Sequence, residues 1–168
     1  MSASKRDILV RNAMKVLDRD GFNATSMDKL VKKTGVSKMT IYKHFRTKED
    51  LILATLRLRD EEFRNLLVRQ VEEKANTPKG RLLAVFDVLT DWIEGRDFRS
   101  CMFIKATSEF QSPDHPIHIA STDHKRHVKG YILELAKQAG AKDPGLLAQQ
   151  LFILTEGEIV AAFMLGKG

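Results

Sequence analysis

Hydrophobic residues recur three and four positions apart along most of the chain, the spacing that places them on one face of an α-helix. Residues 5–19 show it most clearly, with Leu9, Ala13, Val16 and Leu17 on one side and charged residues between them. No segment shows the strict alternation between tight turns that is typical of strands. The pattern therefore predicts an all-α protein, with helices at about residues 5–19, 25–34, 38–45, 48–74, 78–95 and 100–110, a seventh that ends near 139 and an eighth that begins at 144.

The second and third predicted helices are short and close together in the sequence. Thr25 or Ser26 caps the first of them. Gly35 then makes a tight turn, and Ser37 caps the second. Two short helices joined by a turn with glycine form a helix-turn-helix, whose second helix enters the major groove of DNA. We therefore expect a three-helix DNA-binding domain at residues 1–47 and a separate helical domain at residues 48–168.

The side chains of this motif have the chemistry that DNA recognition needs. Hydroxyl residues at helix starts leave backbone N–H groups and the positive end of the helix dipole near phosphates. Tyrosine, histidine and lysine donate to phosphates, whereas lysine also pairs with guanine and the threonine methyl contacts thymine. The expected phosphate contacts are Thr25, Ser26, Ser37, Tyr42, His44 and Lys48, and the expected base contacts are Lys38 and Thr40.

Charge is distributed unevenly along the chain, which carries +6 overall. Residues 1–48 carry +8, and residues 49–168 carry −2. A solvated basic face is the simpler explanation of such an excess, and charge alone does not exclude it. An expression tag is not the source, because the charges interleave with helix-patterned apolar residues. The asymmetry favours a polyanion-binding head joined to a near-neutral body.

The head also resembles a known family. From Gly21 to Leu51 the chain reads GFxATSMxxLVxxxGVSKxTIYxHFxxKExL, which is similar to the signature of the tetracycline-repressor (TetR) family, and the likeness covers nearly all of residues 5–55. It implies a dimer that binds operator DNA, and a helical-bundle body for ligand binding and dimerisation. One departure is Met39, where many relatives have a small residue. The implied phosphate contacts are Thr25 or Ser26, Tyr42, His44 and Lys48, and the implied base contacts are Lys38, Met39, Thr40 and Lys43.

The last predicted helix is apolar on more than one side. Gly157, Ala161 and Ala162 would let another helix approach closely. It is interpreted as a core helix, a dimer face, or both. Members of the family usually pair through their last two helices in a four-helix bundle, and this chain ends after what resembles the first of the two. We therefore expect dimerisation, with either a missing final helix or a reduced interface.

An apolar pocket in the body is the most ordinary place for a small-molecule effector. The same residues also suit a plain hydrophobic core, so the pocket is implied by the resemblance and not by the pattern. In the family, ligand binding moves the long linking helix and spreads the recognition helices. The candidate lining residues are Phe86, Leu89, Trp92, Cys101, Phe103, Phe110, Tyr131 and Phe152.

Two further features suggest other kinds of sensor. Cys101, in a stretch similar to one TetR subgroup with a sensing cysteine, is interpreted as a reactive thiol near a helix start or, preferably, as a small buried hydrophobe. Four histidines cluster with two aspartates and suggest either a metal site or, preferably, a solvated loop and helix start. They are His115, His118, His124 and His127.

The leading hypothesis is a DNA-binding repressor that binds a palindromic operator as a dimer and is released by a small-molecule inducer. The alternatives are a cysteine-based electrophile or redox sensor, a metal sensor, a metal- or cysteine-dependent enzyme, and an architectural DNA binder without an inducer. An enzyme is disfavoured because the sequence contains no recognisable set of nucleophile, base and orienting group. No cofactor is expected. No apolar run approaches about 18 residues and the N-terminus is amphipathic, so we expect no membrane segment, no signal peptide and a cytoplasmic protein.

Overall fold

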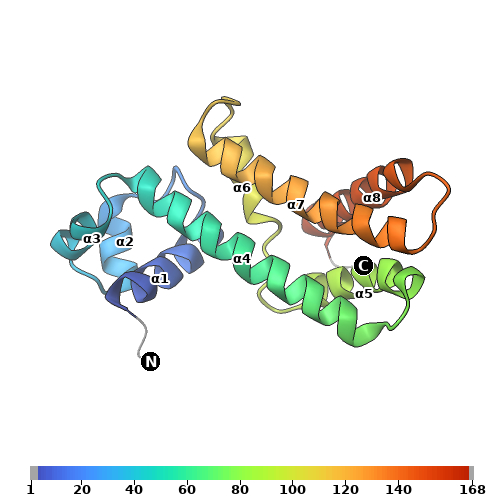
Figure 1. Ribbon diagram of the computed structural model, residues 1–168. Coiled ribbons are helices and arrows are strands. Elements are labelled where there is room, and N and C mark those ends of the chain that lie inside the picture. Colours follow the sequence, from blue (N-terminus) through green and yellow to red (C-terminus); the bar gives the residue numbers. More distant parts are fainter. Residues whose placement is uncertain (1–3, 167–168) are drawn as a thin grey trace. The chain divides into compact units, whose positions relative to one another are not determined.

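The computed structural model describes residues 4–166 and contains α-helices without a β-strand in that range. All eight predicted helices are present, and most of their ends fall within two residues of the prediction. The helices are α1 (Lys5–Asp20), α2 (Met27–Thr34), α3 (Lys38–His44), α4 (Lys48–Lys74), α5 (Pro78–Glu94), α6 (Met102–Glu109), α7 (Pro116–Gln138) and α8 (Pro144–Leu165) (Figure 1).

Contacts between Cα atoms divide the chain into two compact units. The first unit comprises the residues up to Glu61 together with Met102–Thr122, and the second comprises Glu62–Cys101 together with the residues from Asp123 onward. Helix α6 therefore belongs to the same unit as the three N-terminal helices. The predicted domain boundary at residue 47 stays a prediction. The two compact units divide within α4, after Glu61, which the helix pattern of the sequence does not indicate.

Side-chain caps explain where the helices of the first unit begin. Ser4 accepts from the backbone N–H of Asp7, whose carboxylate accepts from Ser4 N–H in return, a complete capping box. Thr47 and Asp50 form the same reciprocal pair at the start of α4, with both bonds at 3.1 Å. Gly35 ends α2 in the left-handed conformation, with φ of 71°, which favours glycine. Gly35 makes the turn that the sequence predicts, and the two capping boxes explain why helices begin near residues 5 and 48 as predicted.

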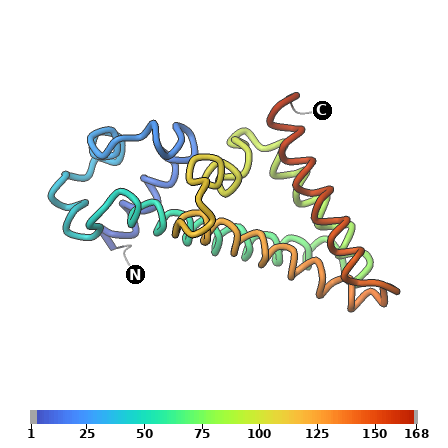
Figure 2. Tube along the Cα trace, turned by 90° about the horizontal axis from the view of Figure 1, so that it is seen from above, coloured from blue at the N-terminus to red at the C-terminus, as the bar shows by residue number. Residues whose placement is uncertain are grey.

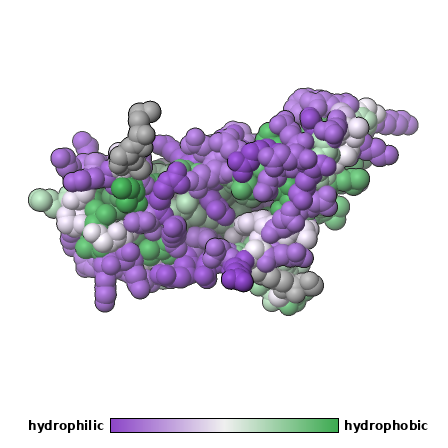
Figure 3. Space-filling model, turned by 90° about the horizontal axis from the view of Figure 1, so that it is seen from below, coloured by the Kyte–Doolittle hydropathy of each residue, from purple (hydrophilic) through white to green (hydrophobic). Residues whose placement is uncertain are grey.

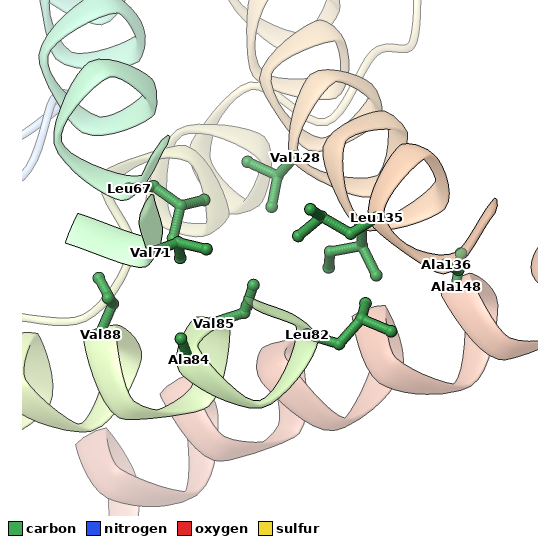
Figure 4. Close-up of a cluster of buried hydrophobic side chains, with 11 residues drawn as sticks. Leu67, Val71, Leu82, Ala84, Val85, Val88, Val128, Leu135, Ala136 and Ala148 are labelled. Carbon is green, nitrogen blue, oxygen red and sulfur yellow. The ribbon is translucent and has the colours of Figure 1, made fainter. Parts of the chain in front are cut away.

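The second unit has an aliphatic core between α4, α5, α7 and α8. Side chains of α4, α5 and α7 point toward one another in Figure 4. Helix α8 returns from the end of α7 and contacts α5 (Figure 2). The core residues are Leu67, Val71, Leu82, Ala84, Val85, Val88, Val128, Ile132, Leu135, Ala136 and Ala148.

Helix α8 differs from the expectation that no segment of the chain could span a membrane. It is long and apolar enough to cross a membrane by length and composition, although no such segment was expected. Only 17% of its most apolar window is buried. Its two acidic residues nevertheless bond within the second unit, because Glu156 pairs with Lys125 at 2.6 Å and Glu158 accepts from Thr90 at 3.3 Å. These polar contacts show that α8 packs against α5 and α7 of its own unit.

Hydrophobic residues also reach the surface outside the core. Figure 3 shows them on one face of the molecule, among polar residues. On α8 they follow a regular order: Leu146, Ile153, Val160 and Met164 are all exposed and recur at intervals of four and seven. This stripe lies opposite a buried stripe of Ala148, Thr155 and Ile159, so α8 has two apolar faces, of which one is uncovered.

Candidate DNA-binding interface

Helix α3 is held by its inner face and leaves its outer face free. Ile41 is fully buried and Phe45, the residue that ends the helix, is 5% exposed. Ser37 caps the helix by accepting from the N–H of Thr40 at 3.2 Å, and the two hydroxyls also bond to each other at 2.8 Å. The remaining side chains of the helix point outward. Lys38, Met39, Tyr42, Lys43 and His44 are all exposed, Met39 to 82%.

The two hydroxyl residues before α2 differ in exposure and in hydrogen bonding. Ser26 is exposed and caps α2 by accepting from the N–H of Lys29 at 3.2 Å. Thr25 is fully buried, and its hydroxyl donates to the carbonyl of Gly21 at 2.7 Å. The expected phosphate contact from Thr25 is therefore wrong in this structure, because its side chain completes the turn after α1. Of the pair, only Ser26 keeps that prediction.

Lys48 has a structural role that the sequence did not indicate. Its ammonium donates to the carbonyl of Phe22 at 3.0 Å and to that of Thr25 at 3.3 Å. An ammonium has three donors, so one remains for a phosphate. Lys48 thus ties the start of α4 to the turn between α1 and α2, and its expected phosphate contact uses at most the donor that these bonds leave.

Lys38 is engaged in an ion pair at the surface. Its ammonium bonds to the carboxylate of Asp28 on α2 at 3.0 Å, and this bond raises the pKa of Lys38. Both side chains are more than half exposed, so the pair is weak and can exchange partners. The pair orients the Lys38 side chain toward Asp28 on α2, and the ammonium keeps two further donors for contact with a base.

Helix α6 braces the turn between α1 and α2 through Glu109. Its carboxylate accepts from the backbone N–H groups of Phe22 at 3.0 Å and Asn23 at 2.5 Å. Gly21 adjoins this contact with φ of 82°, and a Cβ there would meet the Glu109 carboxylate at 3.2 Å. The Phe22 ring also packs edge-on against Phe110, with 6.1 Å between ring centroids.

A second contact from α6 caps the end of α1. The ammonium of Lys105 donates to the backbone carbonyl of Asp18 at 2.6 Å and to its carboxylate at 2.9 Å. A cation at the C-terminus of a helix is favourable because it meets the unpaired carbonyls and the negative end of the dipole. Helix α6 therefore sets the position of the segment that leads into the helix-turn-helix, and the sequence analysis assigned no role to Lys105 or Glu109.

The residues expected to line an effector pocket are divided between the two units. Phe103 and Phe110 belong to the first, and the other six belong to the second. Leu89, Cys101 and Phe103 are buried, which suits a core equally well. Of the eight, Tyr131 lines a groove that the structure contains, between α4 and α7. The remaining pocket residues stay a prediction.

The histidines do not come together. His115 accepts from the N–H of Ile117, and His118 donates to the carbonyl of Phe110 at 2.8 Å. In the second unit, His124 is buried against the ring of Phe63, whereas His127 is exposed. Across residues 4–166 no group of three histidine, cysteine, aspartate or glutamate side chains is placed to hold a metal.

Comparisons with known proteins agree with this geometry. The family model described as bacterial regulatory proteins, tetR family, matches residues 9–55. The HTH-type transcriptional regulator YjdC of Escherichia coli is 22% identical over 153 residues, 91% of this chain and 80% of that protein. The HTH-type transcriptional activator FasR of Mycolicibacterium smegmatis is 34% identical over 92 residues, 54% of this chain and 41% of FasR. Both are named as regulators and not as enzymes.

A solved structure extends the likeness to the body. SCO4454, a TetR-family transcriptional regulator from Streptomyces coelicolor, is 28% identical with a TM-score of 0.89, over 95% of this chain and 84% of that one. The likeness therefore covers the helices after α4 as well as the basic head. The chain is a member of the TetR family of bacterial transcriptional regulators, with an N-terminal helix-turn-helix followed by an all-helical body.

Proposed function

We propose that the chain is a repressor that binds a palindromic operator as a homodimer in the cytoplasm and is released by a small organic effector. The outer face of α3 carries the proposal: Ile41 anchors the helix while Met39, Tyr42 and Lys43 stand free to meet DNA. The +8 charge of residues 1–48 adds the electrostatic attraction that such a contact needs.

The uncovered face of α8 supports the dimer. Two recognition helices must lie about 34–36 Å apart to read two half-sites, which requires a symmetric pair of chains. The exposed stripe of Leu146, Ile153, Val160 and Met164 is flanked by Gly157 and Ala161, small residues that allow close helix packing. A second copy of α8 is the partner that symmetry supplies, because a two-fold interface pairs the same patch with itself.

The bonds from α6 support a response to an effector. An effector changes DNA affinity only if it binds the DNA-incompetent state more tightly. A shift of α6 would break the contacts of Glu109 and Lys105 and free the turn before α2. The operator-binding arrangement is then the one in which these bonds are intact.

Selection of bound sequences from a random DNA library tests the DNA-binding part of the proposal. We expect enrichment of one palindrome whose half-sites lie about one helical turn apart, or a multiple of it. Because FasR is named as an activator, a reporter gene placed behind the selected sequence decides the sign of regulation. Binding without any enriched sequence at physiological salt would contradict the proposal.

Substitutions on α3 will separate base contacts from phosphate contacts. Thr40→Ala will change the preferred base at one position of each half-site, with a loss of roughly tenfold on the selected operator and a smaller loss on other DNA. Tyr42→Phe will weaken binding to all sequences alike, because a phosphate contact carries no base information. Quantitative gel shifts on the selected and a scrambled operator measure both effects. Equal losses on both DNAs for Thr40→Ala would remove it from the base-reading set.

A further inference from the structure

A groove runs between α4 and α7 within the second unit. Its volume is about 320 Å³, at the lower end of the range for small-molecule sites. Aliphatic side chains form its floor, and Leu67 and Val128 there are nearly buried. The lining residues are Arg64, Leu67, Val68, Arg126, His127, Val128, Gly130 and Tyr131.

Two arginines line the groove, and its lining contains no aspartate or glutamate. Arg126 bonds to Asp123 at 2.9 Å, but its side chain is 71% exposed, and a pair in that setting is weak. Its guanidinium can therefore turn to a carboxylate in the groove, which it would hold through a two-pronged bond.

Gly130 keeps the groove open at a cost to the helix. It lies in the interior of the 23-residue helix α7, where glycine is less favourable than alanine. Its φ is not positive, and a Cβ added there would meet nothing within 4 Å. Neither backbone conformation nor close helix packing therefore requires glycine at this position. A missing side chain does leave space in the groove.

Tyr131 lines the groove, but its hydroxyl is buried away from it. Across the described residues, this hydroxyl is the buried side-chain polar atom that lacks a hydrogen-bond partner. Burial and the charge of Glu72 raise the pKa of Tyr131 above its usual value near 10. A buried donor without an acceptor destabilises the protein, so the hydroxyl lowers the stability of the chain and leaves the groove wall at Tyr131 without a donor.

We propose that the α4–α7 groove binds a small organic acid, whose ring or short chain lies on the aliphatic floor and whose carboxylate meets Arg126. This assignment rests on the proposed function, since it names the chemical class of the effector and the place where it binds.

Titration calorimetry of the full chain without DNA tests the assignment. The probes are 1-naphthoate, the neutral 1-naphthamide and the cationic 1-naphthylmethylamine, which share one ring system. We expect 1-naphthoate to bind at least tenfold more tightly than the amide, and the amine to bind more weakly still. Equal binding of acid and amide, or no binding of the acid at millimolar concentration, would overturn the proposal.

Substitutions at Gly130 and Arg126 locate the bound acid. Gly130→Leu fills the groove and should abolish binding of 1-naphthoate while the helix content is kept, and Gly130→Ala serves as the milder form. Arg126→Gln should lower the affinity for the acid at least fivefold and leave the affinity for the amide unchanged. Tyr131→Phe removes the buried hydroxyl, so it should raise the melting temperature of the free protein without lowering the affinity for the acid. Gln138→Leu, at the end of the same helix, is the matched control and should change none of these values.

The outcomes distinguish this site from the function on which it rests. Unaltered binding in Gly130→Leu would place the ligand elsewhere and overturn the groove, while an enriched palindrome would leave the operator-binding regulator standing. Binding that follows the expected pattern, in a protein that selects no operator, would leave the site standing and remove the repressor.

Discussion

Ile153→Glu will separate the proposed dimer into single chains and lower the affinity for a palindromic operator by about a hundredfold or more. Ile153 is 56% exposed on α8, so the substitution leaves the single chain folded. In the dimer, however, the carboxylate would be buried in an apolar interface, which costs several kcal/mol per ion. A two-fold interface repeats the change on both chains.

The predicted loss of operator affinity follows from the way a dimer binds two half-sites. Once one half-site is bound, the other binds within the same complex, and the gain over a single half-site is about 10² to 10⁴. Sedimentation analysis measures the oligomeric state, and gel shifts with full and half operators measure the affinity. The variant should bind a full operator no better than a half operator.

Leu83→Glu is the matched control for this prediction. Leu83 is 65% exposed on α5, outside the stripe on α8, and should tolerate the charge without loss of the dimer. A dimer that survives Ile153→Glu with its operator affinity unchanged would show that α8 does not form the interface.

Glu109→Ala will lower the free energy of unfolding by about 2 kcal/mol, the usual contribution of hydrogen bonds to a charged group. The substitution removes the acceptor for the N–H groups of Phe22 and Asn23. It will also weaken operator binding, because the freed turn leads directly to the cap of α2 at Ser26. Urea unfolding followed by circular dichroism measures the first effect, and gel shifts measure the second.

Two controls separate this contact from a general effect of charge. Glu109→Gln keeps one acceptor oxygen and should lose about half as much stability. Glu134→Ala removes an exposed carboxylate that pairs only across one helix turn with Lys137, and should change the free energy of unfolding by less than about 0.5 kcal/mol. If Glu109→Ala were as mild as Glu134→Ala, the bracing role of α6 would be refuted.

The sequence predicts most of the fold because the helix signals are local. Ser4, Ser37 and Thr47 begin helices where the pattern places them, and Gly35 ends one. Each of these signals depends on residues within about one turn, and a single sequence contains all of that information.

In the candidate interface, the sequence did not show which donors the protein already uses itself. Thr25 has a hydroxyl that could donate to a phosphate, but its burial depends on how the turn after α1 folds over it. Lys48 reaches the carbonyl of Phe22, 26 residues earlier in the chain. A basic or hydroxyl residue in a motif does not reveal whether its donors are already used within the protein.

The bonds from α6 were missed for the same reason. Glu109 and Lys105 each bond to residues 86 or 87 positions earlier, and neither stands in a motif. Only the fold brings them to the end of α1. The α8 stripe was easier to predict, because periodicity alone shows that the helix has two apolar faces.

The discontinuity of the first unit has a consequence for how the protein is made. During synthesis, residues 1–61 leave the ribosome well before Met102–Thr122, yet both belong to the same unit. Domains commonly fold from the N-terminus as they emerge, whereas this unit is completed by a segment that follows 40 residues of another unit. The nascent helix-turn-helix therefore lacks the bonds from Lys105 and Glu109 until most of the chain has been translated.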